Sequence, residues 1–364
     1  MLLIILTCTT AFFFAVNIGA SGAAASIGIA YGSGVLKNKK VALLICGIGI
    51  FLGAALGGAE VTKTLGSAII PENIISAKIA LIILASASIS LFLANLSGIP
   101  LSTSEVTVGA IVGVGIAYQT LFIEKILFIV LIWLLVPLVS FLLVYLANKV
   151  IKIMEQKLDF LSKGIWPRVL AVLVVFTGFL EAFSAGMNNV ANAMGPVIAA
   201  GIMDINVGII IGGLLVALGA FFLGSNVIET NGKRITNLSL LQGSTVSGIG
   251  ATLVIIASVF GIPVPLTQIT TCSILAIGVS DQGKEIWEKK IVKKIAMTWV
   301  LSPIFSLVIS YNLVKVFIDF NYSGLVILFI CIIFVYSLNI IWKHNRKGRP
   351  IVAEKIITKK SGGN

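Results

Sequence analysis

The sequence predicts an all-α polytopic membrane protein, built from two inverted five-crossing repeats with broken or re-entrant helices, plus a final helix. Three observations predict this fold. The 364-residue chain is 58% hydrophobic and only 11% charged, with a mean hydropathy of +1.10, whereas soluble domains carry about 25% charged residues. Its apolar stretches recur at the length of membrane crossings. A short pattern of small and polar residues interrupts them twice, 167 residues apart.

Eleven apolar stretches correspond to about 11–12 transmembrane segments. A crossing needs about 20 residues, and somewhat shorter stretches suit broken helices. The stretches cover residues 1–36, 41–58, 75–97, 100–118, 126–148, 169–203, 206–223, 240–260, 264–280, 295–317 and 324–342, and the first and sixth are interrupted. A cleaved signal peptide at 2–16 is the less favoured interpretation, because no basic residue precedes it and a matching segment recurs downstream.

Matching motifs define the repeat. The segment Gly19–Gly28 (GASGAAASIG) corresponds to Gly186–Gly195 (GMNNVANAMG), and each places small, hydrogen-bonding residues inside an apolar stretch. Gly98–Thr107 (GIPLSTSEVT) likewise corresponds to Gly261–Thr270 (GIPVPLTQIT). With five crossings in each half, the second half enters the membrane upside down. Transporters organised in this way bind their substrate at the interface between the repeats.

The distribution of basic residues between corresponding loops agrees with an inverted second half. Lys37, Lys39 and Lys40 form a basic loop, whereas the corresponding loop near Asp204 has no Lys or Arg. By the positive-inside rule we expect an outside N-terminus and a cytoplasmic C-terminus in the plasma membrane. The predicted parts are a first inverted repeat at 1–148, a basic cytoplasmic linker at 149–168, a second inverted repeat at 169–317, a final transmembrane helix at 318–342 and a basic cytoplasmic tail at 343–364.

Several classes of protein are excluded. The net charge of +12 lies in short loops and the tail, so no nucleic-acid partner is expected. The four cysteines have no paired spacing, which predicts no disulfide, metal site or cofactor. The only histidine, His344, lies in the tail. Since no nucleophile–base pair or metal cluster occurs at membrane depth, we do not expect an enzyme.

The paired motifs make the chain resemble the inorganic phosphate transporter (PiT) family. That family carries a signature of roughly G-A-N-D-V-A-N-A/S-x-G in each half, which the segment Gly186–Gly195 matches well. Pro100–Glu105 (PLSTSE) resembles the family's Pro-x-Ser-Thr-Thr-His segment. The resemblance covers nearly the whole chain, and it implies secondary transport of an inorganic anion.

The departures from the family signature concern its two aspartates. Gly22 stands at the first and Asn189 at the second, and this variant resembles the bacterial sulfate permease (CysP-type) branch. Phosphate near neutral pH keeps a proton that a carboxylate can accept. Sulfate has no such proton, so an ionised Asp beside it would be an unpaired buried repulsion of several kcal/mol. Replacing both aspartates removes that repulsion, and Asn189 adds an amide donor.

An uncharged cradle is predicted around the anion. We expect broken helices whose N-termini direct backbone N–H groups and the positive end of the dipole at the substrate. The predicted substrate-binding residues are Gly19, Ser21, Gly22, Ser102, Thr103, Ser104, Asn188, Asn189, Asn192 and Thr267. For an isolated Ser or Gly, helix packing is the alternative role. Three amides within five residues are costly without partners, which favours binding for the asparagines.

Two glycine pairs are interpreted differently. Gly53 and Gly57, and likewise Gly109 and Gly113, are spaced for close helix packing rather than for ligand binding.

The expected function is secondary active import of inorganic sulfate by alternating access. Moving a dianion against an inside-negative potential of 100 mV costs about 4.6 kcal/mol, so net uptake needs either a large sulfate gradient or cotransported cations. The chain has no phosphate-cradling loop ending in Gly-Lys-Ser/Thr. Loss of both aspartates favours protons over Na⁺. The coupling candidates are Glu105 and Glu181, with a water-exposed carboxylate at a helix start as the alternative for Glu105.

Two other transport functions are alternatives. One is a phosphate symporter driven by Na⁺ or H⁺. The other is a passive anion channel, although channels usually line a pore with rings of residues from symmetric subunits. The expected partners are sulfate, the coupling cation and the lipid bilayer, and a homodimer is an alternative to a monomer.

Overall fold

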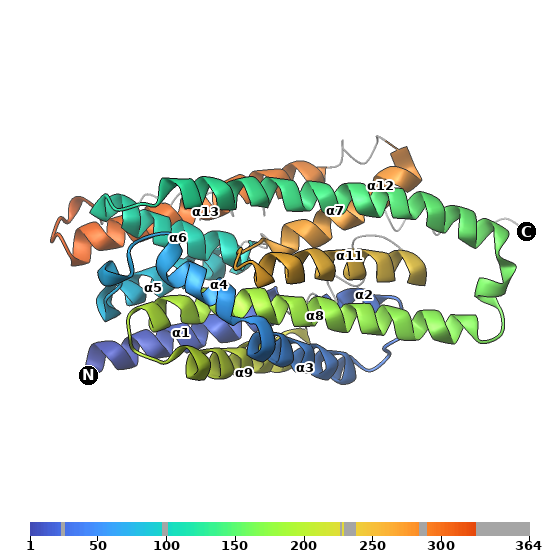
Figure 1. Cartoon of the computed structure of the whole chain (residues 1–364), viewed down its shortest axis with the longest axis horizontal. Coiled ribbons are helices and arrows are strands. Elements are labelled where there is room, and N and C mark those ends of the chain that lie inside the picture. Colours follow the sequence, from blue (N-terminus) through green and yellow to red (C-terminus); the bar gives the residue numbers. More distant parts are fainter. Residues whose placement is uncertain (23–25, 97–100, 226–227, 229–237, 284–289, 325–364) are drawn as a thin grey trace, which may run out of the picture.

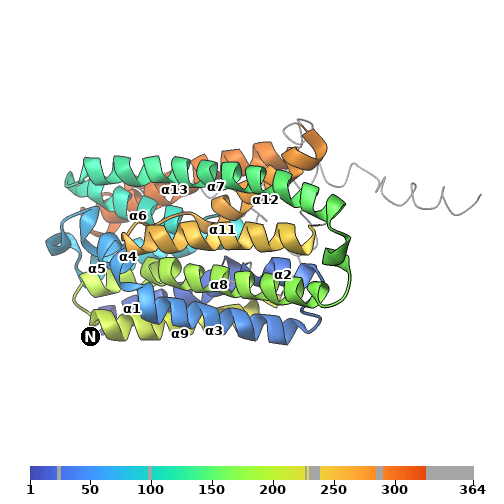
Figure 2. The same cartoon turned by 45° about the vertical axis from the view of Figure 1, so that its right-hand side comes forward.

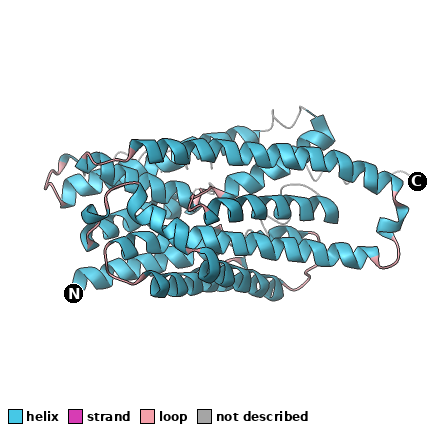
Figure 3. Cartoon of the chain, viewed as in Figure 1, coloured by secondary structure: helices cyan, strands magenta, loops and turns pink. Residues whose placement is uncertain are grey.

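The computed structural model describes residues 1–22, 26–96, 101–225, 228, 238–283 and 290–324. Helices make up nearly all of this part, which contains no strand (Figure 3). Within it, seven helices are long and apolar enough to cross a membrane, and two shorter apolar helices accompany them. The long helices lie side by side along the longest axis of the molecule (Figures 1 and 2). The predicted all-α membrane fold is confirmed.

The helices follow the predicted apolar stretches closely. The first half contains α1 (Leu2–Ser21), α2 (Gly28–Gly32), α3 (Lys39–Gly57), α4 (Ala59–Lys63), η2 (Thr64–Ala68), η3 (Glu72–Ile74), α5 (Ala77–Leu96), α6 (Thr103–Tyr118) and α7 (Ile123–Lys157). After η4 (Asp159–Ser162), the second half contains α8 (Trp166–Ala199), α9 (Ile205–Leu223), α11 (Leu240–Val259), α12 (Leu266–Gln282) and α13 (Lys290–Phe317). The predicted final helix lies outside the described residues from 325 onward, as does the tail.

The predicted linker at 149–168 is partly helical. Helix α7 runs through it to Lys157, and α8 begins at Trp166. With 35 residues, α7 is about 52 Å long, whereas the hydrocarbon core of a bilayer is about 30 Å thick. Helix α7 is therefore longer than one perpendicular crossing requires, and its last turns carry the basic residues Lys149 and Lys152.

The predicted interruption at 186–195 is absent, and this prediction was wrong. Helix α8 is continuous from Trp166 to Ala199, with Pro196 only in its last turn. Ala, Met and Asn all adopt helical backbone, so no residue in the motif forces a break. The first motif does end a helix, because α1 stops at Ser21 and α2 begins at Gly28.

Polar side chains lie inside the bundle, while many apolar ones face outward. Leu134, Leu138 and Phe222 are exposed, whereas Ser90 and Asn148 are fully buried. This arrangement suits a bilayer, because lipid solvates leucine well but leaves a polar group without a partner. Many buried hydroxyls bond within their own helix, as when Ser90 Oγ donates to the Ser86 carbonyl at 2.7 Å.

A polar network joins α7, α11 and α12 near the end of α12. Asn148 Nδ2 donates to Asp281 Oδ1 at 3.0 Å, and its Oδ1 accepts from Gln242 Nε2 at 3.0 Å. Lys152 Nζ lies 2.8 Å from Asp281 Oδ1 and donates to the Ser280 carbonyl at 2.7 Å. Because Asn148 uses both ends of its amide, the network fixes the end of α12 against α7.

Glycines set the close packing of α3 on α8. A Cβ atom at Gly53 would clash with the carbonyl oxygen of Phe183, and one at Gly186 with that of Ile50. A Cβ at Gly109 would likewise clash with the carbonyl of Pro303, on the α6–α13 contact. The backbones therefore touch directly, which supports the packing role predicted for Gly53 and Gly109.

We expect Gly53→Ala to lower the melting temperature of the detergent-purified protein. The added methyl group has to displace backbone, and overpacking of this kind costs about 1–3 kcal/mol. Gly248→Ala on α11 is the matched control, because its Cβ would meet only Thr177 Cγ2 at an ordinary 3.5 Å. Equal melting temperatures for Gly53→Ala and the wild type would contradict the assigned contact.

Candidate functional site

Four separate elements meet at one small internal cavity. The end of α1, the starts of α6 and α12, and the middle of α8 each contribute to it. The lining residues are Gly22, Leu101, Ser102, Thr103, Asn189, Leu266 and Thr267. Five of them belong to the predicted substrate-binding set, namely Gly22, Ser102, Thr103, Asn189 and Thr267. None of the seven lining residues is charged.

Two helix N-termini converge on this cavity. Helix α6 begins at Thr103 and α12 at Leu266, and neither Ser102 nor Pro265 caps its helix with a side-chain hydrogen bond. The first N–H groups of each helix therefore have no capping acceptor, and the positive ends of both dipoles meet here. Anions bind at such helix starts. The expected N-termini are present, but they come from the two Gly-Ile-Pro segments rather than from the second signature motif.

Asn188 supports the backbone around the cavity. Its Oδ1 accepts from the Val264 N–H at 3.1 Å, while its Nδ2 donates to the Val264 carbonyl at 2.9 Å. The same Nδ2 lies 3.0 Å from Ser104 Oγ, which itself donates to the Val264 carbonyl at 3.1 Å. Asn188 and Ser104 thus hold the extended segment before α12 and do not line the cavity.

Asn189 presents its amide group to the cavity. Its Oδ1 accepts from Thr103 Oγ1 at 3.0 Å, from Asn188 Nδ2 at 3.3 Å and from Asn192 Nδ2 at 3.4 Å. With the oxygen occupied by these donors, the Nδ2 group is left to face the cavity. Asn192 lies behind it, fully buried, and its Oδ1 has no hydrogen-bond partner.

Two further predicted residues, Gly19 and Ser21, lie near the end of α1. Gly19 faces α9, since a Cβ atom there would clash with the carbonyl oxygen of Val216. The structure thus gives Gly19 a packing contact and does not bring it to the cavity. Ser21 is the last residue of α1, and its side chain lies outside the described part of the structure.

Glu105 is buried at the start of α6. It is 1% exposed, so the alternative of a water-exposed carboxylate is wrong. Its Oε1 accepts from Gln268 Nε2 on α12, and its Oε2 accepts from Ser302 Oγ on α13. Both carboxyl oxygens are therefore satisfied by neutral donors, and Glu105 ties three helices together.

Glu181 has a different environment on α8. It is 2% exposed, and its Oε1 accepts from Thr270 Oγ1 on α12 at 2.8 Å. Its Oε2 has no hydrogen-bond partner, and neither does the buried Oγ of Ser247 on α11. Asn188 follows seven residues later, two turns along the same helix face.

Sequence reasoning missed several residues of the site. Gln268 occupies the position in the second Gly-Ile-Pro motif that Glu105 occupies in the first, so the repeat itself carried the signal for this pair. Thr270 belongs to the same motif. No motif marked Ser302 or Val264, whose roles depend on how α13 and the segment before α12 pack.

Comparisons with known proteins agree with this geometry. The profile described as "Phosphate transporter family" matches residues 18–310. Sulfate permease CysP of Bacillus subtilis (strain 168) is 49% identical over 343 residues, covering 94% of this chain and 96% of that protein. A putative phosphate permease of Pyrococcus furiosus is 29% identical, covering 82% of this chain and 92% of that protein.

A solved structure has the same fold. It is described as the sodium-dependent phosphate transporter, with a TM-score of 0.74 and 25% sequence identity over 86% of this chain and 99% of that chain. The names of these three proteins describe permeases or transporters of sulfate or phosphate, and the similarity covers 82–94% of this chain. It is a multi-pass membrane protein that belongs to the phosphate transporter family.

Proposed function

We propose that this protein is a secondary active importer of inorganic sulfate. The observation that carries the proposal is the uncharged cavity between the starts of α6 and α12, with Gly22 and Asn189 at the positions of the signature aspartates. N–H groups and hydroxyls bind a dianion without fixing it permanently, which a carrier requires. The 49% identity to a protein named as a sulfate permease supports the same substrate.

The electrostatics of the cavity favour sulfate over phosphate. An ionised carboxylate among the lining residues would repel a fully deprotonated dianion, and none is present there. The alternative of phosphate is supported by the names of the more distant relatives and of the similar solved structure. Uptake of labelled sulfate into proteoliposomes, with phosphate as competitor, separates the two substrates.

Residues at equivalent positions of the two repeats lie next to each other, which supports alternating access between inverted halves. Gly22 and Asn189 occupy corresponding positions and line one cavity, while Glu105 and Gln268 correspond and bond each other. Such meetings are expected near an internal two-fold axis. The free volume of the cavity, about 10 Å³, holds about one water molecule. A tetrahedral oxyanion needs more room, so its entry requires the halves to move apart. This need for movement favours a carrier over a passive channel.

We propose protons as the coupling cation and Glu181 as their carrier, with Glu105 as the second candidate. Glu181 is buried and its Oε2 makes no hydrogen bond of ordinary geometry, so the ionised form is costly in low dielectric. A proton on Oε2 removes that charge. The hydroxyl of Ser247 on the neighbouring helix can accept a hydrogen bond from the protonated carboxyl or donate one to the ionised carboxylate, so it suits a group that changes its protonation state. The oxygens of Glu105 are both occupied already.

We further propose the orientation that the basic loops predict. The N-terminus then lies outside, and the linker and the tail lie in the cytoplasm. The two inverted repeats at 1–148 and 169–317 are part of this proposal, and a homodimer is an alternative to a monomeric carrier.

Asn189→Asp is expected to lower the initial rate of sulfate uptake at least about tenfold. The new carboxylate would face a dianion in a poorly hydrated cavity, and about 1.4 kcal/mol of repulsion already gives a factor of ten. Labelled phosphate, measured in parallel, is expected to gain relative to sulfate. The matched control is Asn206→Asp at the exposed start of α9, which is expected to transport sulfate like the wild type. Unchanged sulfate kinetics in Asn189→Asp would contradict the electrostatic proposal.

Glu181→Gln is expected to abolish sulfate accumulation driven by a pH gradient, while sulfate exchange at equal pH persists. Glutamine is neutral at every pH and cannot release a proton. An entrapped pH-sensitive dye reports the coupled proton flux in the same vesicles, and sodium gradients are tested separately. The control is Glu155→Gln at the exposed end of α7. If Glu181→Gln kept its pH response while Glu105→Gln lost it, the proton carrier would be Glu105 instead.

A further inference from the structure

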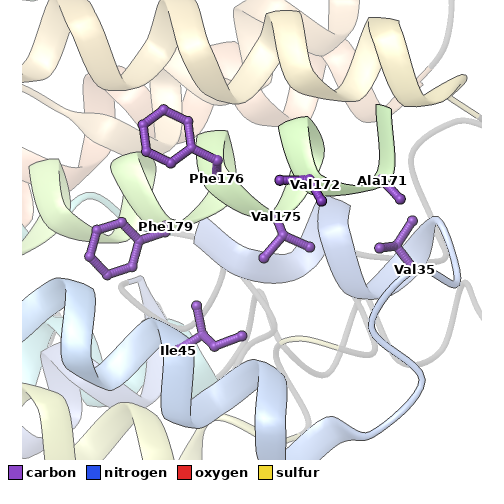
Figure 4. A pocket seen from close by; sticks show the side chains of 7 residues that line it. All are labelled: Val35, Ile45, Ala171, Val172, Val175, Phe176 and Phe179. Carbon is purple, nitrogen blue, oxygen red and sulfur yellow. The ribbon is translucent and has the colours of Figure 1, made fainter. Parts of the chain in front are cut away.

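A second hollow lies on the outside of the bundle, and it shares no residue with the anion cavity (Figure 4). Its volume is about 420 Å³, and every residue that lines it is apolar. Six of the seven are Val35 in the segment before α3, Ile45 on α3, and Ala171, Val175, Phe176 and Phe179 on α8. We call this hollow the α3–α8 groove.

The groove exists because α3 and α8 separate toward their N-termini. Farther along, at Gly53 and Gly186, the two backbones touch. The two helices run parallel, since Gly49 packs near Phe179 and Gly57 near Met187. Toward the start of α3 the small residues give way to Ile45, whose bulk holds the helices apart. The N-termini of α3 and α8 therefore lie at the same end of the groove.

Basic residues lie near that end in the sequence. Lys37 follows Val35 by two residues, Lys40 lies in the first turn of α3, and Arg168 precedes Ala171 by one turn of α8. All three side chains are exposed. Residues 26–59 and 160–180 contain no Asp or Glu, and Asp159 in η4 is the acidic residue nearest in sequence to Arg168. Three basic residues against this one carboxylate leave a net positive charge at this end. The positive charge at this end is therefore available to a negatively charged ligand.

We propose that the α3–α8 groove binds an anionic phospholipid, with one acyl chain along Val175 and Phe179 and the phosphate against Lys37, Lys40 and Arg168. From Ala171 to Phe179 the groove follows α8 for about 12 Å. That length is most of the depth of one leaflet, which is about 15 Å. A chain enters from the bilayer itself, because the rim residues Val172 and Phe176 are exposed on the outside of the helix. A zwitterionic lipid fits the apolar part equally, but the cation in its headgroup offsets its phosphate, so it brings no net negative charge to the basic end.

The experiment compares two lipids on the full-length purified protein. Delipidated protein is incubated with phosphatidylglycerol or phosphatidylcholine of identical chains, and retained lipid is counted by native mass spectrometry. The wild type is expected to retain one phosphatidylglycerol tightly, and each basic residue replaced by Gln is expected to weaken its retention about fivefold. Lys125→Gln, at the start of α7, is the matched control and is expected to change nothing.

Filling the groove provides a second variant. Val175→Trp occupies the acyl-chain path and is expected to reduce retention of both lipids, whereas the combined Lys37→Gln, Lys40→Gln and Arg168→Gln variant reduces only that of phosphatidylglycerol. Size-exclusion profiles show whether each variant folds, and the charge variant alters only exposed side chains. Equal retention of the two lipids by the wild type would overturn the proposal, and so would a charge variant that binds phosphatidylglycerol like the wild type.

Discussion

The rest of this structure depends on two helix starts that face each other inside a membrane. The first N–H groups of α6 and α12 have no side-chain cap, and the bilayer around the bundle supplies no water to replace one. Both helices direct positive dipole ends at one point, which is unfavourable unless negative charge lies between them. Under the proposed function, an anion bound in the cavity would accept hydrogen bonds from both helices at once and so stabilise the contact between the two halves of the chain.

Holding the helix starts in place requires polar partners that are themselves satisfied. Asn188 does this for α12 by pairing with both backbone groups of Val264, in the way one strand residue pairs with another. Glu105 does it for α6 through Gln268 and Ser302. The polar groups of Asn188 and Glu105 are already hydrogen-bonded within the protein, so they are not free to bind an anion. The amide group of Asn189 is the side-chain donor proposed for the anion. Asn188 is thus a supporting residue of the cavity, and Asn189 is a lining residue.

The sequence predicted the helices well but not the form of the second motif. Helix α9 at Ile205–Leu223 differs from the predicted stretch by one residue, because apolar length and the Asp204 cap define it locally. Helix α8 was predicted to break, because its motif places small, hydrogen-bonding residues inside an apolar stretch. The amides of Asn188, Asn189 and Asn192 need partners there. The partners exist, but they come from α6 and from Val264, far away in the chain. Only tertiary packing supplies them, so composition alone could not exclude the break.

Coupling between ion and substrate follows from where the two candidate sites lie. Helix α8 carries Asn189 at the cavity and Glu181 about two turns before it, while α12 carries Thr267 at the cavity and Thr270 on Glu181. Any movement of α12 against α8 therefore alters both sites together. Under the proposed mechanism, opening the cavity separates Thr270 from Glu181 and changes how readily that carboxyl holds a proton. The proposed proton and anion sites share the same pair of helices. If binding of the anion changes the affinity for the proton, binding of the proton changes the affinity for the anion by the same factor.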